Sequence, residues 1–150
     1  MLRSESPSGG PAANGLRVLV VEDNVDAAET LRMLLEVWGH QIALACTGRA
    51  AVAEAVRFGP DVVLCDLGLP EMDGLAVAQA LRRDPATARA YLIALSGYAE
   101  DSDVERARQA GFDLHLTKPV DPRRLRQILG AFVHDPQGGL RWSGKAEDAI

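Results

Sequence analysis

The sequence predicts an α/β protein with a three-layer sandwich architecture, in which a doubly wound, five-stranded parallel sheet lies between two layers of helices. The first observation is a set of apolar runs that are continuous rather than alternating, as in strands covered on both faces. These runs are residues 18–21, 42–45, 62–65, 92–95 and 114–116. The second observation is that a segment with a helical apolar period follows each run. Strand and helix thus alternate along the chain, and right-handed crossovers join such strands into one parallel sheet.

Capping residues and breakers mark the first three helices. The first helical segment has one apolar face, formed by Ala28, Leu31, Leu35 and Trp38. Thr47 can cap the second helix, and Gly59 is placed to end it. The pair Asp73 and Gly74 indicates a turn and the entry into the third helix.

The last two helices have markers of the same kind. Ser102 and Glu105 form a capping-box pattern before the fourth helix, and Gly111 ends that helix. Asp121 followed by Pro122 is typical of an N-cap with proline at the first helical position. The apolar face of this fifth helix is formed by Leu125, Ile128, Leu129 and Phe132.

Composition limits the classes of protein and of partner. The chain has 150 residues, 47% hydrophobic and 25% charged, which is ordinary for one soluble domain. A formal net charge of −5 gives no basic field for nucleic acid. No apolar run reaches the roughly 20 residues of a membrane helix. The first residues lack a signal-peptide pattern. Cys46 and Cys65 have no metal-ligand spacing and are interpreted as reduced core thiols. We therefore expect a cytoplasmic protein that binds neither nucleic acid nor membrane.

The chain divides into three parts by composition. Residues 1–15 are rich in serine, glycine and proline and are predicted to be a flexible tail. Residues 16–134 are expected to form the domain. Residues 135–150 return to proline, glycine and charge, so we expect a loose C-terminal tail, too short for an output domain, in which Trp142 could dock on the domain or on a partner.

Polar side chains follow four of the predicted strands, and ligand sites of parallel sheets lie beyond the carboxyl ends of the strands. The residues at these ends are Glu22, Asp23, Asn24, Asp66, Gly68, Ser96, Thr117 and Lys118. Three carboxylates bring about −3 into one crevice, where each pair at about 5 Å costs roughly 3 kcal/mol at an effective dielectric of 20. Lys118 cancels one of these charges. The remaining negative charge, about −2, favours a divalent cation. Oxygen ligands with room for water favour Mg²⁺.

A bound Mg²⁺ keeps coordination positions for phosphate oxygens, so this edge of the sheet is predicted to bind phosphate. Ser96 can donate a hydrogen bond to one phosphoryl oxygen, and Lys118 can pair with another. Asp66 ends the central strand and is the carboxylate best placed to act as a nucleophile, since carboxylates form acyl phosphates.

Four motifs occur in order, each at the end of a predicted strand. They are Val-Val-Glu-Asp-Asn (20–24), Asp-Leu-Gly-Leu-Pro-Glu-Met-Asp-Gly (66–74), Ala-Leu-Ser-Gly-Tyr (94–98) and Thr-Lys-Pro (117–119). With them, residues 16–133 resemble the receiver domain of response regulators in bacterial two-component signalling, both single-domain regulators and the receivers of hybrid kinases. The resemblance implies a flavodoxin-like (βα)5 fold with strand order 2-1-3-4-5.

The resemblance also implies a role for each matching residue. Asp66 would accept a phosphoryl group from a histidine of a histidine kinase or of a histidine phosphotransfer protein. Asp23 would bind Mg²⁺ directly and Glu22 would help, often through water. Asp66 itself and the backbone carbonyl of Gly68 would complete the protein ligands.

The remaining implied roles concern the switch. Ser96 would move towards the phosphoryl group, Lys118 would form an ion pair with it, and a cis bond to Pro119 would shape the loop. The output would be contact with a downstream protein through the fourth helix, fifth strand and fifth helix, or onward transfer in a phosphorelay. No enzyme activity beyond the domain's own phosphotransfer and dephosphorylation is implied.

Two positions depart from the family pattern. The acidic pair is Glu22–Asp23 where two aspartates are commoner. His115 stands where the family often has tyrosine or phenylalanine, so a pH-sensitive imidazole could replace a rotating aromatic ring in the switch.

Two other classes of function are open. An aspartate-nucleophile phosphohydrolase would need a second carboxylate two residues after the nucleophile, where this chain has Gly68. A phosphorylation-independent interaction module on the same fold is the other alternative. The arginines of the last two helices suit either a solvated face or a partner surface; they are Arg106, Arg108, Arg123, Arg124 and Arg126. Other candidates have structural interpretations: His40 and His134 at the surface, and Met33 and Met72 in packing.

Overall fold

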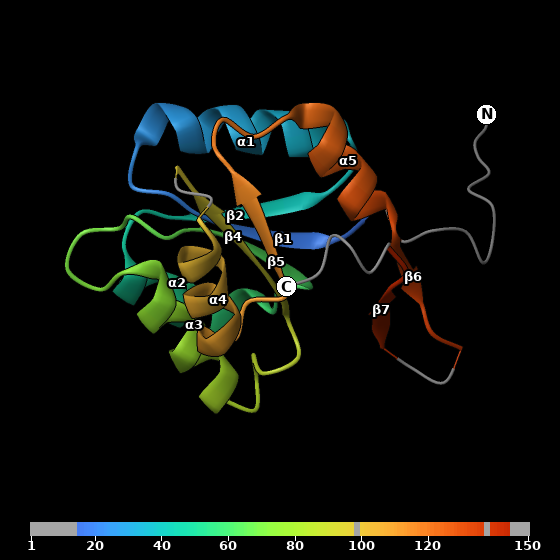
Figure 1. The fold of residues 1–150 in the computed structure, drawn as a ribbon. Coiled ribbons are helices and arrows are strands. Elements are labelled where there is room, and N and C mark those ends of the chain that lie inside the picture. Colours follow the sequence, from blue (N-terminus) through green and yellow to red (C-terminus); the bar gives the residue numbers. More distant parts are fainter. Residues whose placement is uncertain (1–14, 98–99, 137–138, 145–150) are drawn as a thin grey trace.

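The computed structural model describes residues 15–97, 100–136 and 139–144 (Figure 1). Five strands form one parallel sheet in the order β2-β1-β3-β4-β5, which confirms the predicted fold class and strand order. The strands are β1 (Arg17–Val21), β2 (Gln41–Ala45), β3 (Val62–Asp66), β4 (Tyr91–Ser96) and β5 (Leu114–Thr117). The helices are α1 (Val25–Val37), α2 (Gly48–Phe58), α3 (Gly74–Arg83), α4 (Asp101–Ala110) and α5 (Pro122–Gly130). None of these described helices is long and apolar enough to cross a membrane.

Each predicted strand is confirmed, and each extends one or two residues beyond its apolar run. The backbone ladder continues past the last apolar side chain because its hydrogen bonds do not depend on side-chain polarity. β3 therefore extends to Asp66 and β4 extends to Ser96. All residues of β3 are buried. The ladder thus fixes the backbone of two candidate site residues.

The helices cover the two faces of the sheet and form two apolar cores. α2, α3 and α4 lie on one face, and α1 and α5 lie on the other (Figure 1). On the first face Ala51, Val77 and Ala107 pack against alternate residues of the strands, such as Leu92. The second face is packed by the remaining alternate strand residues together with α1 and α5. Strands buried on both sides explain the continuous apolar runs of the sequence.

Most predicted helix ends are confirmed. The side chains of Thr47, Asp73 and Asp121 each accept a hydrogen bond from a backbone N–H of the first helical turn. Gly59 ends α2 in the left-handed conformation that glycine adopts without strain. The capping box predicted at Ser102 is wrong: the N-cap of α4 is Glu100, two residues earlier, and Glu100 makes no side-chain capping hydrogen bond.

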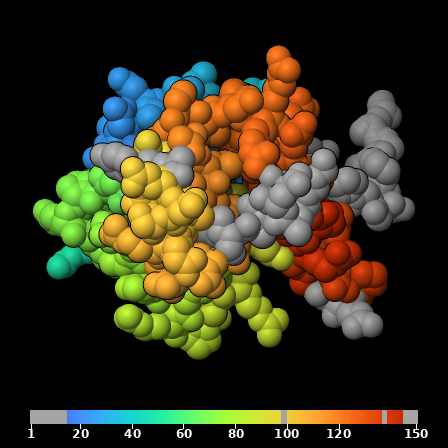
Figure 2. All heavy atoms as spheres, in the orientation of Figure 1, coloured from blue at the N-terminus to red at the C-terminus, as the bar shows by residue number. Residues whose placement is uncertain are grey.

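The expectation of a loose C-terminal tail is wrong for the described part of that segment. β6 (Phe132–His134) and β7 (Leu140–Trp142) form an antiparallel hairpin that lies at one edge of the molecule, beside α5 (Figures 1 and 2). Trp142 docks on the domain, because its Nε1–H donates to the Ile128 carbonyl and its backbone N–H donates to the Tyr91 hydroxyl, both at 3.1 Å. Phe132, predicted on the apolar face of the fifth helix, belongs to β6 and is fully buried there.

Three burial predictions are also wrong. His40, expected at the surface, is buried at the turn between α1 and β2, where its backbone N–H donates to the Leu35 carbonyl. Cys46, expected in the core, is exposed beyond the end of β2. Met33, expected in packing, lies on the solvent face of α1 and is 59% exposed. These residues lie where an element ends or on the unburied side of a helix, and periodicity discriminates poorly there.

Arg82 joins three segments at the edge of the sheet opposite the candidate site. Its guanidinium donates to the carbonyl oxygens of Gly111, Ala88 and Ala90 at 2.6–3.0 Å and forms an ion pair with Asp113 at 2.7 Å. The fork of the guanidinium suits several oxygens at once. Arg82 therefore ties the end of α3 to the segment before β4 and to the turn between α4 and β5, a role beyond that of a dipole-complementing charge at a helix end.

Candidate functional site

The predicted site residues converge at the carboxyl edge of the parallel sheet. Glu22 directly follows β1, Asp66 ends β3, Ser96 ends β4 and Lys118 directly follows β5. Glu22 and Asp66 are almost fully buried, at 2% and 8% exposed, whereas Asp23 is exposed. The order of strands, which brings β1 and β3 side by side, places these carboxylates next to each other.

Lys118 links two of the carboxylates. Its Nζ donates to Glu22 Oε1 and to Asp66 Oδ2, each at 2.9 Å. Burial alone lowers the pKa of Lys118, but hydrogen bonds and charge attraction from Asp66 and Glu22 outweigh burial and raise the pKa above its ordinary value. Lys118 is therefore a fixed positive charge in this site. The Lys118–Pro119 peptide bond is cis, in agreement with the resemblance.

The acidic cluster suits a divalent cation. Carboxylate oxygens of Glu22, Asp23 and Asp66 all lie within 4.8 Å of one another. Lys118 compensates about one of these negative charges, and a net charge near −2 remains. An oxygen-only donor set with one exposed member leaves room for water, which is the coordination that Mg²⁺ prefers.

The Asp66 carboxylate is oriented from two sides. The backbone N–H of Gly68 donates to Oδ1 at 2.9 Å, and Lys118 holds Oδ2. Gly74, at the start of α3, is essential to this arrangement, since a Cβ there would lie 2.7 Å from the Asp66 carbonyl oxygen and 2.8 Å from Leu67 Cα. The chain thus turns from β3 into α3 at a distance that only glycine permits.

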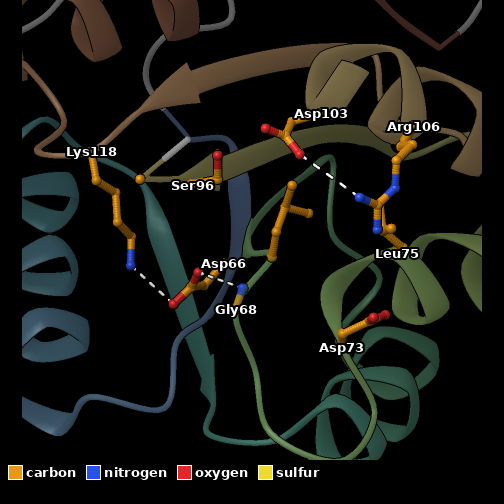
Figure 3. A pocket seen from close by; sticks show the side chains of 10 residues that line it. Asp66, Gly68, Asp73, Leu75, Ser96, Asp103, Arg106 and Lys118 are labelled. Carbon is orange, nitrogen blue, oxygen red and sulfur yellow. Dashed lines mark hydrogen bonds and ion pairs between the residues drawn. The ribbon is translucent and has the colours of Figure 1, made fainter. Parts of the chain in front are cut away.

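A cavity of about 540 Å³ opens above Asp66 (Figure 3). Lys118 points at Asp66 from one side, and Arg106 of α4 lies on the opposite side, paired with Asp103 at 3.8 Å (Figure 3). Sequence reasoning assigned Arg106 only to a basic helix side and did not single out Asp103. Their spacing of three residues, at the start of the helix that follows Ser96, is the signal that could have found them.

Ser96 and His115 contact each other. Ser96 Oγ and His115 Nε2 lie 3.0 Å apart, within hydrogen-bond distance. Burial lowers the pKa of His115, while the charge of Asp103 opposes this effect and is the smaller influence. His115 is half-buried, as predicted.

Cys65 precedes Asp66 and was interpreted as a packing residue. It is fully buried, and burial, together with the charge of Asp66, raises the pKa of its thiol well above the ordinary value. Cys65 belongs to the apolar core on the side of the sheet that α2, α3 and α4 cover, which confirms the packing interpretation. Tyr98, the end of the third motif, lies outside the described residues.

A doubly wound sheet with an acidic cluster and a lysine at its carboxyl edge is the arrangement of a receiver domain, the phosphorylation switch of two-component signalling. Residues 18–130 match the family of the response regulator receiver domain. The chain belongs to this family.

Relatives of different architecture share the domain. The transcriptional regulatory protein KdpE of Mycobacterium tuberculosis is 41% identical over 116 residues, which are 77% of this chain and 50% of that protein. The polar-differentiation response regulator DivK of Brucella ovis is 31% identical over 118 residues, 79% of this chain and 96% of that protein. The chain therefore spans about half the length of KdpE and nearly all of DivK.

A solved structure shares both the fold and a substantial part of the sequence. The receiver domain of the sensor histidine kinase PA1611 from Pseudomonas aeruginosa is 33% identical, with a TM-score of 0.71 over 77% of this chain and 94% of that domain. That domain has a magnesium ion coordinated in its active-site cleft.

Proposed function

We propose that this protein is a phosphorylation-dependent signalling switch in which Asp66 accepts a phosphoryl group from a histidine kinase or a histidine phosphotransfer protein. One observation carries the proposal: the Asp66 carboxylate lies within 4.8 Å of those of Glu22 and Asp23, and Lys118 holds it at 2.9 Å. A carboxylate that is oriented beside a fixed cation and a metal-binding cluster is prepared for phosphoryl transfer. Membership of the receiver family supports the same role.

In the transfer, a carboxylate oxygen of Asp66 forms a bond to phosphorus while the phosphorus–nitrogen bond of the phosphohistidine breaks. The imidazole nitrogen of the donor keeps the electron pair of that bond. Lys118, now paired with Oδ2, is placed to pair with a phosphoryl oxygen as negative charge moves there. The Ser96 hydroxyl, at the end of the neighbouring strand β4, would donate to another phosphoryl oxygen.

The side chains of Glu22, Asp23 and Asp66 and the backbone carbonyl of Gly68 would hold Mg²⁺. The magnesium ion in the active-site cleft of the PA1611 receiver supports the choice of Mg²⁺ as the cation. When bound, Mg²⁺ neutralises the negative charge shared by the carboxylates and the phosphoryl oxygens. Without it, the residual charge of the cluster would repel the anionic donor.

Phosphorylation would change the surface formed by α4, β5 and α5 (Figures 1 and 2). α4 and α5 cover opposite faces of the sheet, and they lie together with β5 on one side of the molecule. Two or three new charge-assisted hydrogen bonds, at about 1.5–3 kcal/mol each, supply the several kcal/mol that shift a switch between states. On α4, Arg106 and Arg108 pair with Asp103 and Glu105, which partly neutralises the basic side predicted there. A downstream protein, or a further protein in a phosphorelay, would bind this face.

The wider assignment follows from the same proposal. The protein would act in the cytoplasm of a bacterium, with protein partners and neither nucleic acid nor membrane as its ligand. Its chemistry would be limited to its own phosphotransfer and dephosphorylation. A domain that keeps the fold and works without phosphorylation is the alternative that the first experiment must exclude.

Intact mass measured after incubation with Mg²⁺ and acetyl phosphate tests the proposal. We expect one added phosphoryl group that requires Mg²⁺ and that the Asp66→Asn variant does not acquire. Asp73→Asn is a matched control, because Asp73 lines the same cavity, loses the same charge and keeps its N-cap role as asparagine.

Three results would contradict the proposal. No modification in a folded protein that also fails to bind Mg²⁺ would favour the phosphorylation-independent module. Rapid turnover of small phosphate esters would favour a phosphohydrolase. Modification of the Asp66→Asn variant would place the acceptor elsewhere.

A further inference from the structure

His115 lies beside the hydroxyl that the proposed switch uses. β4 and β5 are parallel neighbours, and their register pairs Ala94 with His115 and Ser96 with Thr117. Leu114 and Leu116 of β5 pack on the side of the sheet that α1 and α5 cover. Successive side chains of a strand point to opposite faces, so His115 faces the α4 side, as Ala94 does. Ser96 is only 5% exposed, and the 3.0 Å contact between its Oγ and His115 Nε2 is thus shielded from water.

The hydrogen atoms available to this contact limit what Ser96 can do. A serine hydroxyl has one hydrogen to donate, and an ionised phosphoryl oxygen can only accept. A neutral imidazole with its hydrogen on Nδ1 accepts the hydrogen of Ser96 at Nε2. An imidazolium instead donates from Nε2 to the Ser96 oxygen and no longer accepts the hydroxyl hydrogen. Ser96 can therefore bond to a protonated His115 and to a phosphoryl group at the same time.

α4 and the start of α5 bring charged groups near His115. Asp103 of α4 acts on His115 and favours the imidazolium, and Arg106 of the same helix reduces this influence by pairing with Asp103 at 3.8 Å. Asp121, the N-cap of α5, and Arg124 of α5 line the same cavity of about 300 Å³ as His115. Burial outweighs Asp103, so the pKa of His115 lies below its ordinary value and the imidazole is neutral at neutral pH.

We propose that His115 is a positioning residue for Ser96: its protonation decides whether the Ser96 hydroxyl hydrogen is held by His115 or turns to a phosphoryl group on Asp66. This inference rests on the proposed function, in which Asp66 accepts that group. In the resting domain the neutral imidazole holds the hydroxyl. The negative charge of a phosphoryl group favours the imidazolium, so that phosphorylation and proton uptake at His115 are linked. By reciprocity, lower pH favours the state in which Ser96 is engaged.

The first test follows the carbon-bound ring protons of His115 by NMR across pH. The whole chain is titrated with Mg²⁺ alone and with Mg²⁺ plus beryllofluoride, a stable mimic of a phosphoryl group on a carboxylate. We expect beryllofluoride to raise the titration midpoint of His115 by about one pH unit. His134, which is exposed on β6, serves as the internal control and should not shift.

A second arm tests the hydrogen bond itself, without any phosphoryl group. Ser96→Ala removes the donor to the neutral imidazole and also the acceptor for the imidazolium. The hydrogen bond of the charged form is the stronger of the two, so the midpoint of His115 should fall by about half a pH unit. Ser96→Thr keeps a hydroxyl and should restore the midpoint. A midpoint that stays or rises in Ser96→Ala would show that Ser96 does not accept from the imidazolium, and would overturn the inference.

A third arm measures the reciprocal effect by calorimetry. The beryllofluoride affinity of the wild type is divided by that of His115→Gln at each pH. This ratio should be about ten times larger at a pH below the two titration midpoints of His115, with and without beryllofluoride, than at a pH above them. The glutamine side chain keeps hydrogen-bonding groups and does not titrate. The ratio cancels every pH dependence that the two proteins share.

The outcomes separate the inference from the proposed function. If beryllofluoride binds and the midpoint of His115 does not move, the inference is overturned and the proposed function stands. If Asp66 takes up neither beryllofluoride nor a phosphoryl group, the proposed function fails, and the inference fails with it. If the midpoint rises and the affinity ratio follows, both are supported.

Discussion

Replacement of Asp23 by asparagine should stabilise the protein in the absence of divalent cations. The exposed Asp23 carboxylate has two negative neighbours, Glu22 and Asp66, within 4.8 Å. At that distance one pair costs about 0.9 kcal/mol at the dielectric of water and about 3.5 kcal/mol at an effective dielectric of 20. Asp23 is exposed, so the lower value applies, and Lys118 offsets one of the two repulsions. We expect Asp23→Asn to raise the free energy of unfolding by about 1 kcal/mol.

The sign of this effect should reverse when Mg²⁺ is present. A cation that binds only the folded wild type stabilises it by mass action, by about 2.7 kcal/mol at a concentration of 100 times its dissociation constant. Asp23→Asn removes a charged ligand, so the variant should gain little from the same Mg²⁺ concentration. The variant is then more stable than the wild type in a chelator and less stable in saturating Mg²⁺.

Urea unfolding followed by circular dichroism, in a chelator and in Mg²⁺, measures both effects. Asp26→Asn is the matched control, because Asp26 is exposed in the first turn of α1 and has no place in the acidic cluster. Loss of its favourable position at a helix N-terminus should lower stability by about 0.3–1 kcal/mol and leave the response to Mg²⁺ intact. An Asp23→Asn variant that is destabilised in the chelator, or that gains as much from Mg²⁺ as the wild type, would refute the electrostatic account of the cluster.

Two further predictions concern positions outside the site. Burial lowers the pKa of His40, so the unfolded state binds a proton at this residue more readily than the folded state does. The free energy of unfolding, measured with urea, should therefore fall as pH drops from about 7.5 to 5.5. An equal pH dependence in His40→Gln would refute this. Arg82→Lys should cost about 1–3 kcal/mol, because an ammonium cannot satisfy three carbonyls and Asp113 as the forked guanidinium does. Arg83→Lys, at the exposed neighbouring position, is the control and should change the free energy of unfolding by less than about 0.5 kcal/mol. An equal loss of stability in Arg82→Lys and Arg83→Lys would show that the contacts of Arg82 contribute nothing.

Much of the fold could be predicted because its signals are local. Continuous apolar runs gave strands, and Thr47, Asp73 and Asp121 capped helices as their types and positions suggested. Ser102 failed as a cap because a capping box within an acidic stretch fits more than one register, and the helix began earlier, after Glu100. The sequence does not predict the hairpin that ends in Trp142, because strands of three residues are too short to show a clear period.

The sequence by itself determined which residues reach the site. A side chain directly after a parallel strand must lie at the carboxyl edge of the sheet, so the positions of Glu22, Asp66, Ser96 and Lys118 in the sequence already placed them together.

Only the tertiary structure decided how these groups contact one another. Lys118 lies 96 residues from Glu22 in the chain, and its bond to that carboxylate depends on strand order and on the direction of each side chain. The contact of Ser96 with His115 and the bond of Arg82 to the Gly111 carbonyl also join segments distant in sequence, 19 and 29 residues apart. Local patterns set backbone conformation, whereas such contacts are set by the packing of elements that no local pattern describes.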